Sequence, residues 1–179
     1  MNLSQKQLEK YLISLPSNKD LLGDIYDATY EALYAFIVTI VKDRELAKDL
    51  THDTYLTIYK NSSRYQAQGH PMAWIYAIAK NNAMMHIRKN QHEVTIEDNL
   101  EIAVKQIDVV TNVTVESVLN TLKTEEREIM VMRHLSEMSF KDISKILELP
   151  LATVLSKYHR TMKKLKKEVH KWNKILKKH

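Results

Sequence analysis

The stretch FKDISKILELPLATVLSKYHR, from Phe140 to Arg160, has the pattern of two short helices joined by a tight turn. Ser139 precedes it and Asp142 follows three residues later, a spacing that resembles the capping box of a helix start. The turn falls at 148–150, and Pro150 suits the opening of the second helix because proline is tolerated in a first helical turn. This spacing predicts a helix-turn-helix, whose second helix, rising ~1.5 Å per residue, can lie in the major groove of DNA.

Positive charge is concentrated in the same third of the chain. The 179 residues include 27 Lys plus Arg and 22 Asp plus Glu. From Leu119 to His179 there are 15 basic and 7 acidic residues, a net charge of +8, which leaves −3 for the remainder. This distribution is expected when one part of a protein meets phosphate and another meets protein. A solvated lysine-rich tail would have the same composition.

The remaining sequence is predicted to be helical as well. With only 2 Gly and 3 Pro, few residues interrupt a helix. Apolar residues recur at spacings of three and four over 21–41, 42–60 and 71–90, and these three helices predict one domain. Asp43 is placed to cap the second helix, and Pro71 opens the third. The apolar stripe of the second helix consists of Leu46, Leu50, Tyr55 and Ile58.

Periodicity weakens between His92 and Glu116, where acidic residues face a single Lys105. We interpret this segment as an acidic linker. The predicted division is an N-terminal arm at 1–19, a helical domain at 20–92, the linker at 93–112, and a helix-turn-helix domain with a basic helical extension at 113–179. The predicted fold class is therefore all-α, with two small helical domains.

Catalysis finds little support in the sequence. The eight histidines show no HExxH spacing, no glycine-rich loop could cradle a phosphate, and there is no cysteine. We therefore expect no catalytic residue, no cofactor and no metal. The absence of cysteine fits a reducing compartment, and no run approaches the roughly 20 apolar residues that span a bilayer. We expect a cytoplasmic protein without membrane insertion.

Three stretches carry a resemblance in a fixed order: IYDATYEALYAFIVTIVKDRELAKDLTHDTYL, AWIYAIAKNNAMMHIRK and LKTEEREIMVMRHLSEMSFKDISKILELPLATVLSKYHRTMKKL. In this order they resemble the extracytoplasmic-function group of bacterial sigma factors, whose two helical domains are called region 2 and region 4. The resemblance implies a promoter-specificity subunit that binds RNA polymerase core and brings it to two promoter DNA elements. It leaves an anti-sigma protein open as a third partner.

The resemblance assigns the stretch AKDLTHDTY to the region 2 helix that docks on polymerase. Exposed carboxylates beside apolar anchors suit a partner rich in arginine. The residues implied at this interface are Asp49, His52, Asp53 and Tyr55.

The stretch RYQAQGHPMAWIYAIAKNN is similar to the loop and helix that open the upstream-of-start element. Strand opening needs a surface that holds an extruded base and cations that follow the exposed backbone. Residues implied for the base are Tyr65, Gln66, Gln68 and His70, and those implied for the strand are Lys80, Asn81, Arg88 and Lys89. Trp74 lies on the apolar face, and we expect it in the core.

In region 4 the resemblance implies that the recognition helix reads the distal promoter element. Phosphate contacts would position this helix, and base readout would fall to residues near its N-terminus. The implied contacts are Thr153, Ser156, Lys157, His159, Arg160, Lys163 and Lys164. The sequence departs from the family pattern at three positions. Leu155 stands where the family usually has Lys, Pro150 stands where it often has a Ser cap, and Glu148 stands where it commonly has Gly in the turn.

An apolar stripe follows the recognition helix and its extension at spacings of four and three, an a/d heptad pattern. Its members are Leu151, Leu155, Tyr158, Met162, Leu165, Val169, Trp172 and Leu176. We expect one face of this helix to pack and the opposite face to meet phosphate. The hypothesis for 169–176 is packing on region 2, on an inhibitory partner or on a second copy; folding back on its own domain is the alternative.

Two other functions stay open on the sequence alone. The first is a helix-turn-helix repressor with 1–89 as a ligand or dimer domain, which would bind duplex DNA without polymerase. The second is a sigma-like adaptor without promoter selectivity, kept open by Leu155 and by the missing family Asp near Met85.

Overall fold

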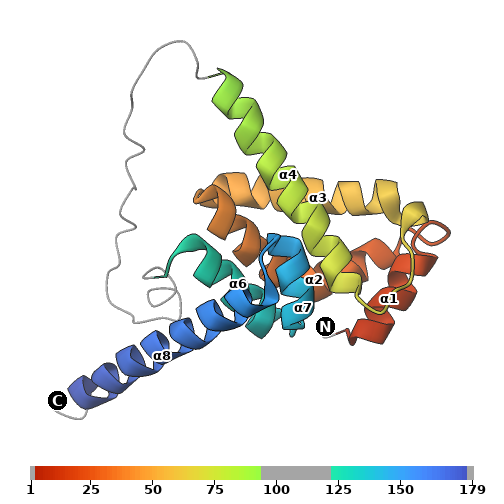
Figure 1. Ribbon diagram of the computed structural model, residues 1–179. Coiled ribbons are helices and arrows are strands. Elements are labelled where there is room, and N and C mark those ends of the chain that lie inside the picture. The colour runs from red at the N-terminus through yellow and green to blue at the C-terminus, as the bar shows by residue number, and fades with distance from the viewer. Residues whose placement is uncertain (1–2, 94–121, 177–179) are drawn as a thin grey trace.

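The computed structural model describes residues 3–93 and 122–176, with side chains at 3–90 and 122–167. Every regular element within these ranges is helical, which confirms the all-α fold class (Figure 1). The elements are α1 (Gln5–Ser14), α2 (Leu21–Val41), α3 (Arg44–Asn61), the short 3₁₀ helix η1 (Ser62–Arg64), α4 (Pro71–Glu93), α6 (Thr124–Leu135), α7 (Phe140–Leu147) and α8 (Leu151–Leu176). The predicted acidic linker lies outside the described residues, apart from Glu93 at the end of α4.

Helices α2, α3 and α4 lie where the periodicity predicts three helices. They pack on one another in all three pairs. Asp43 is the N-cap of α3 and accepts a hydrogen bond from Leu46 N–H at 3.0 Å, as expected for a short acidic side chain at that position. The apolar faces of these helices therefore enclose one core, and Ile25, Phe36 and Ile75 are fully buried in it.

Helix α1 belongs to the same packed unit. Ser4 caps it and forms a capping box with Gln7, which satisfies donors at the helix start. Leu8, Leu12 and Leu15 are buried where α1 meets α2 and α4. The apolar contact of these three leucines fixes α1 against both longer helices.

Helices α6, α7 and α8 build the predicted helix-turn-helix unit. Ser139 is the N-cap of α7, and its hydroxyl both accepts from Asp142 N–H at 3.1 Å and donates to Asp142 Oδ2 at 2.7 Å. Glu148 ends α7 in the left-handed region at φ 56°, a conformation that favours glycine. Pro150 then precedes α8, so the tight turn lies where the sequence predicts it.

The two units are docked on each other. Helix α6 packs on α2, and α7 packs on α4 (Figure 1). At their junction the Tyr76 ring meets Phe36 edge-on at 4.8 Å, and its hydroxyl lies 2.8 Å from Ser136 Oγ. The buried residues of both units, including Leu33 from α2 and Ile129 from α6, form one continuous hydrophobic core.

The packing face of α8 differs from the predicted heptad stripe. Val154 and Thr161 are fully buried, whereas Leu151, the first member of the stripe, has 43% of its surface exposed. Leu155 and Tyr158 are half-buried beside this line. The buried line therefore runs one position away from the predicted one, and α8 packs on both α6 and α7. Side chains of the predicted extension at 169–176 lie outside the described ones.

None of the helices in the described ranges combines the length and the apolarity needed to cross a membrane.

Candidate nucleic-acid and protein interfaces

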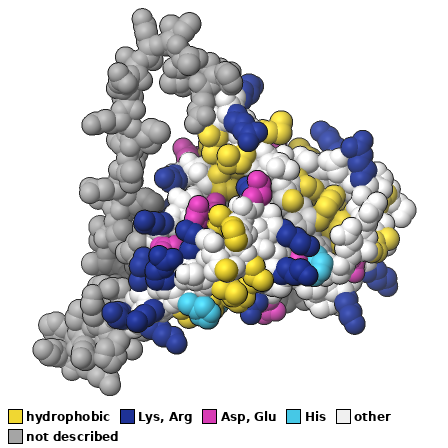
Figure 2. All heavy atoms as spheres, viewed as in Figure 1, with side chains coloured by type: hydrophobic (Ala, Val, Ile, Leu, Met, Phe, Trp, Pro, Cys, Tyr) yellow, Lys and Arg dark blue, Asp and Glu magenta, His cyan; other side chains and the backbone are white. Residues whose placement is uncertain are grey.

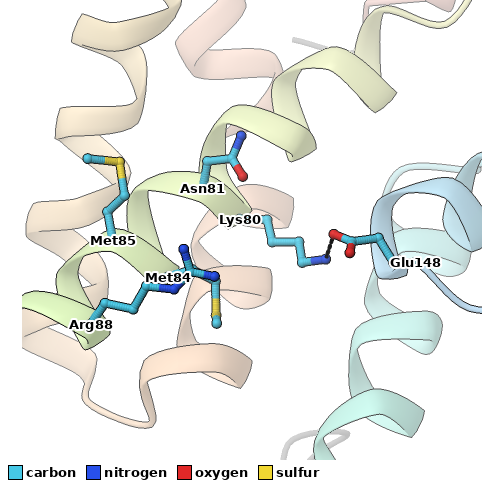
Figure 3. Close-up of a pocket in the computed structure, with 6 residues that line it drawn as sticks. All are labelled: Lys80, Asn81, Met84, Met85, Arg88 and Glu148. Atoms are coloured by element: carbon cyan, nitrogen blue, oxygen red, sulfur yellow. Dashed lines mark hydrogen bonds and ion pairs between the residues drawn. The ribbon is translucent and has the colours of Figure 1, made fainter. Parts of the chain in front are cut away.

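A pocket of about 400 Å³ lies on α4, next to the turn between α7 and α8. Two cations, an amide and two thioethers of α4 line it, with one carboxylate of the turn opposite (Figure 3). The lining residues are Lys80, Asn81, Met84, Met85, Arg88 and Glu148. Cations suit phosphate oxygens, and thioether carbons suit the flat face of a base. Three of the four residues predicted to follow a DNA strand thus meet here, and Lys89 is exposed beyond them on α4.

Lys80 is held by the helix-turn-helix unit. Its Nζ donates to the backbone oxygen of Ile146 at 2.7 Å and to Glu148 Oε1 at 2.9 Å. Hydrogen bonding from Lys80, together with its charge, lowers the pKa of Glu148. Only 23% of the Lys80 side chain is exposed, against 82% of Glu148, so the carboxylate covers the lysine from the solvent side. The glutamate that replaces a family glycine therefore serves as a partner for α4.

A further contact between the units involves the loop that precedes α4. His70 Nδ1 lies 3.1 Å from Asp142 Oδ2, and Asp142 is buried at the start of α7. Asp142 thereby combines two roles, because the same oxygen accepts from Ser139 within its own unit. His70 itself stays half exposed, with 54% of its side chain accessible.

The four residues predicted to hold a base occupy this loop in different ways. Gln66 and Gln68 are exposed. Tyr65 is half-buried, and its hydroxyl donates to Glu9 Oε1 of α1 at 3.2 Å. The ring of Tyr65 also meets Trp74 edge-on at 5.0 Å, which agrees with the expectation that Trp74 packs inward. The loop directly precedes α4 and the pocket lies further along it, about 15 Å along the helix axis from His70 to Lys80.

The predicted DNA contacts on α8 fall into two groups: lysines that form ion pairs with α6, and residues on an exposed face. Lys157 Nζ lies 2.7 Å from Glu125, and Lys164 Nζ lies 3.3 Å from Glu126, both in the first turn of α6. Burial alone would raise the pKa of Glu126, but hydrogen bonds from Lys123 N–H and Lys164 lower it. The exposed face consists of Ser156, His159, Arg160 and Lys163, and Thr153 lies half-buried beside it. Lys and Arg side chains gather over this part of α8 in Figure 2.

Helix α3 presents the predicted polymerase contacts Asp49, His52 and Asp53 on its exposed side. Tyr55 requires a correction, because only 4% of its surface is exposed. Its hydroxyl lies 2.8 Å from Thr29 Oγ1, and burial raises the pKa of the phenol. Tyr55 is therefore a core residue that joins α3 to α2 and cannot touch a partner directly in this conformation.

A row of tyrosines beside this surface was missed by the sequence reasoning. Tyr26, Tyr30 and Tyr34 recur every four residues on α2, and their rings stack at 4.9 and 5.9 Å. His52 joins the row, with Nε2 3.2 Å from the Tyr26 hydroxyl. We call these four residues the tyrosine row. The spacing of four in YDATYEALY was the available signal, and it marks a half-buried aromatic surface next to the carboxylates of α3.

Glu128 of α6 is a buried carboxyl close to the junction of the two units. Burial and the nearby charge of Glu125 raise its pKa to about 7, and Lys80 of α4 acts in the opposite direction. Close to neutral pH, this carboxyl therefore exchanges a proton at the place where the two units meet.

Two family models match the chain: Sigma-70 region 2 over residues 25–93 and Sigma-70 region 4 over residues 113–165. Together they span about two thirds of the sequence. The first covers α2 from Ile25 to the end of α4, and the second covers α6, α7 and α8 as far as Leu165.

Curated relatives match across both units. The chain is 28% identical over 152 residues to the ECF RNA polymerase sigma factor SigM of Bacillus subtilis (strain 168), covering 81% of this chain and 93% of that one. It is 24% identical to the RNA polymerase sigma factor YlaC of the same organism, covering 86% and 95%. Among solved structures, the sigma factor RpoE, crystallised in complex with the anti-sigma factor NepR from Bartonella quintana, matches with a TM-score of 0.59 and 22% identity over 78% of this chain and 91% of that one.

A helix-turn-helix repressor would share only the C-terminal unit with these proteins, whereas the matches run in order through both units. The chain therefore belongs to the extracytoplasmic-function group of the sigma-70 family, and it is an alternative sigma factor that binds RNA polymerase core and directs promoter recognition and strand opening.

Proposed function

We propose that three surfaces divide this work: the exposed side of α3 with the tyrosine row for polymerase, the loop and pocket of α4 for the opened strand, and the exposed face of α8 for the distal element. The observation that supports this assignment most is the pocket, where Lys80, Asn81 and Arg88 lie with two methionines. Backbone cations beside apolar side chains are the combination that single-stranded nucleic acid requires. The protein would bind promoter DNA and position it on polymerase, and polymerase would catalyse RNA synthesis.

The polymerase surface combines charge with apolar area. Asp49 and Asp53 are exposed, and Leu56, one turn further along α3, has 54% of its surface exposed. An arginine-rich partner could pair with the carboxylates while the leucine and the tyrosine row supply contact area. Tyr55 would support this surface indirectly, because it fixes α3 on α2.

Regulation by an anti-sigma protein is a further part of the proposal, supported by a similar solved structure. The similar structure of RpoE contains the anti-sigma factor NepR. For this chain, we infer a partner of that class that competes with polymerase core. Promoter recognition would place the protein in the cytoplasm, where bacterial polymerase meets DNA.

Reconstitution with purified bacterial RNA polymerase core tests the assignment. We expect the protein to co-elute with core, and the complex to start transcripts at discrete sites on genomic DNA. The double variant Asp49→Arg/Asp53→Arg should lose co-elution, whereas Asp20→Arg, an exposed carboxylate in the α1–α2 turn, should keep it. Arg88→Ala should co-elute normally and lose the discrete starts.

Two results would contradict the assignment. If the double variant co-eluted with core as well as the wild-type protein does, α3 would not be part of the polymerase interface. If Arg88→Ala and Asn81→Ala left the transcript start sites unchanged, the pocket would not contact the opened DNA strand.

A further inference from the structure

The loop of residues 65–70, between η1 and α4, is tied to a residue far away in sequence. Glu9 of α1 accepts the Gly69 N–H at 2.7 Å and the Tyr65 hydroxyl at 3.2 Å, both through Oε1. These bonds hold the loop near its two ends. Gly69 has φ 76°, so the backbone turns there through the left-handed region before α4 begins.

Tyr65 is fixed by this arrangement on both sides. Its ring lies edge-on against Trp74, and its hydroxyl faces the Glu9 carboxylate. Burial, followed by the charge of Glu9, raises the pKa of this phenol. The side chain is thus an anchor, and a base extruded at the loop would meet the exposed Gln66 and Gln68 in its place.

Glu9 can act as a fixed point because α1 is firmly docked. Leu8 and Leu12, on either side of Glu9 in the helix, are buried against α2 and α4. The Glu9 contacts also lie within the N-terminal unit. They therefore persist if α7 moves away, whereas the contact between His70 and Asp142 does not.

The physical gain is preorganisation. Hydrogen bonds to an ionised carboxylate are shorter and about twice as strong as bonds between neutral groups. A loop that is already ordered loses less conformational entropy when a base enters. An amide at position 9 would keep one oxygen acceptor but lose the charge.

We propose that Glu9 is a positioning residue for strand opening, which holds the 65–70 loop so that Gln66 and Gln68 meet an extruded base of the promoter. The proposal rests on the proposed function of this loop. Glu9 does not touch DNA itself. It sets base selectivity at one promoter position through its hydrogen bonds to the backbone of Gly69 and the hydroxyl of Tyr65.

The test uses holoenzyme and a promoter found by mapping its transcript starts. Each position of the upstream-of-start element is randomised in turn, and transcripts from each library are sequenced. Wild-type holoenzyme should prefer one base strongly at the extruded position. Gln66→Ala and Gln68→Ala should reduce that preference and thereby identify the position.

Glu9→Ala should reduce the preference at that same position about fivefold, the factor expected for one lost hydrogen bond, and leave the preferences elsewhere unchanged. Glu9→Gln should restore part of it, and Tyr65→Phe should give a smaller loss. Glu31→Ala, an exposed glutamate on α2, is the matched control. Thermal unfolding and co-elution with core show that each variant is folded.

The outcomes separate the two hypotheses. If the loop variants change the preference but Glu9→Ala and Tyr65→Phe do not, the positioning role of Glu9 is overturned and the loop keeps its function. An even loss at all positions with Glu9→Ala would overturn it too, because that pattern means a general structural role. If neither glutamine matters, the loop assignment fails and the role of Glu9 fails with it.

Discussion

Thr161 is fully buried on the packing face of α8, and its hydroxyl has no hydrogen-bond partner among the described residues. A buried hydroxyl that has lost water without gaining a partner costs free energy. We expect Thr161→Val, which keeps the shape and removes the hydroxyl, to raise the free energy of unfolding by about 1 kcal/mol. Urea unfolding measures this. Thr161→Ser, which keeps the hydroxyl and loses a methyl group, should be less stable than wild type; a loss in both variants would show that the hydroxyl is bonded.

Glu128 should make stability depend on pH. Its pKa is raised from 4.5 to about 7 in the folded state, chiefly by burial, so the folded protein holds this proton more tightly than the unfolded chain. The resulting stabilisation is fully present below pH 4.5 and is lost as the pH rises through 7. We expect the free energy of unfolding to fall by on the order of 3 kcal/mol across this window.

Glu128→Gln should remove most of that fall, because an amide does not titrate. Chemical unfolding at a series of pH values checks this, with Glu31→Gln as the exposed control. A fall of equal size in Glu128→Gln would assign the pH dependence to other groups.

Single residues were predictable where local chemistry decides their place. Asp43 and Ser139 cap helices because short polar side chains reach the free N–H groups of the next turn. Tyr55 shows the opposite case. Helical periodicity placed it on the apolar stripe of α3, and only the family resemblance moved it to an interface. The structure agrees with the periodicity, because burial follows the packing of α3 on α2.

At the scale of elements, the contribution of one α8 cation to DNA binding can be measured. Lys163 is exposed beside Ser156 and His159. If it contacts a phosphate, Lys163→Ala should weaken holoenzyme binding to all distal elements alike and reduce the slope of log K against log salt by about 0.9. Fluorescence anisotropy at several salt concentrations measures the slope. Lys10→Ala on α1 is the matched control, and an unchanged slope with Lys163→Ala would place this residue away from the phosphates.

The helices were predictable from spacing, caps and breakers, but their contact faces were less so. The buried line of α8 lies one position from the predicted stripe, because the line at 154 and 161 and the line at 151 and 155 are neighbours on one helix. Which of them is buried depends on where α6 and α7 lie, and the sequence of α8 does not contain that information. Helix α1 did leave a signal: its leucines at 8, 12 and 15 follow helical spacing within a polar segment.

At the scale of the whole molecule, no sequence pattern predicted how the two units dock on each other. Besides the shared hydrophobic core, the docking involves single polar pairs, namely Lys80 with Glu148, His70 with Asp142, and Tyr76 with Ser136. Each pair joins residues at least sixty positions apart, and no periodicity links them. Glu148 was recognisable as a departure from the family, but its partner could come only from the structure.

The docked arrangement can be followed by energy transfer, because the sequence has no cysteine. Dyes at Ser63→Cys and Lys141→Cys would label exposed positions of the two units. Polymerase core should lower the transfer efficiency, since two separate DNA elements require the units to part. Glu148→Lys should lower it without core, because it sets a second cation beside Lys80.

Glu137→Lys makes the same charge change in the turn between α6 and α7 and should leave the transfer efficiency unchanged. Equal efficiency in wild type and Glu148→Lys would mean that the pair with Lys80 contributes little to docking.

The contact of Glu148 with Lys80 joins two parts of one polypeptide, so its occupancy is set by an effective concentration fixed by the tether and not by how many molecules a cell contains. A phosphate group that reaches Lys80 must displace a carboxylate that never diffuses away. Raising the copy number would therefore leave the docked fraction as it is. Only a molecule that binds one arrangement better than the other can shift that population, and it can shift it by no more than its difference in affinity.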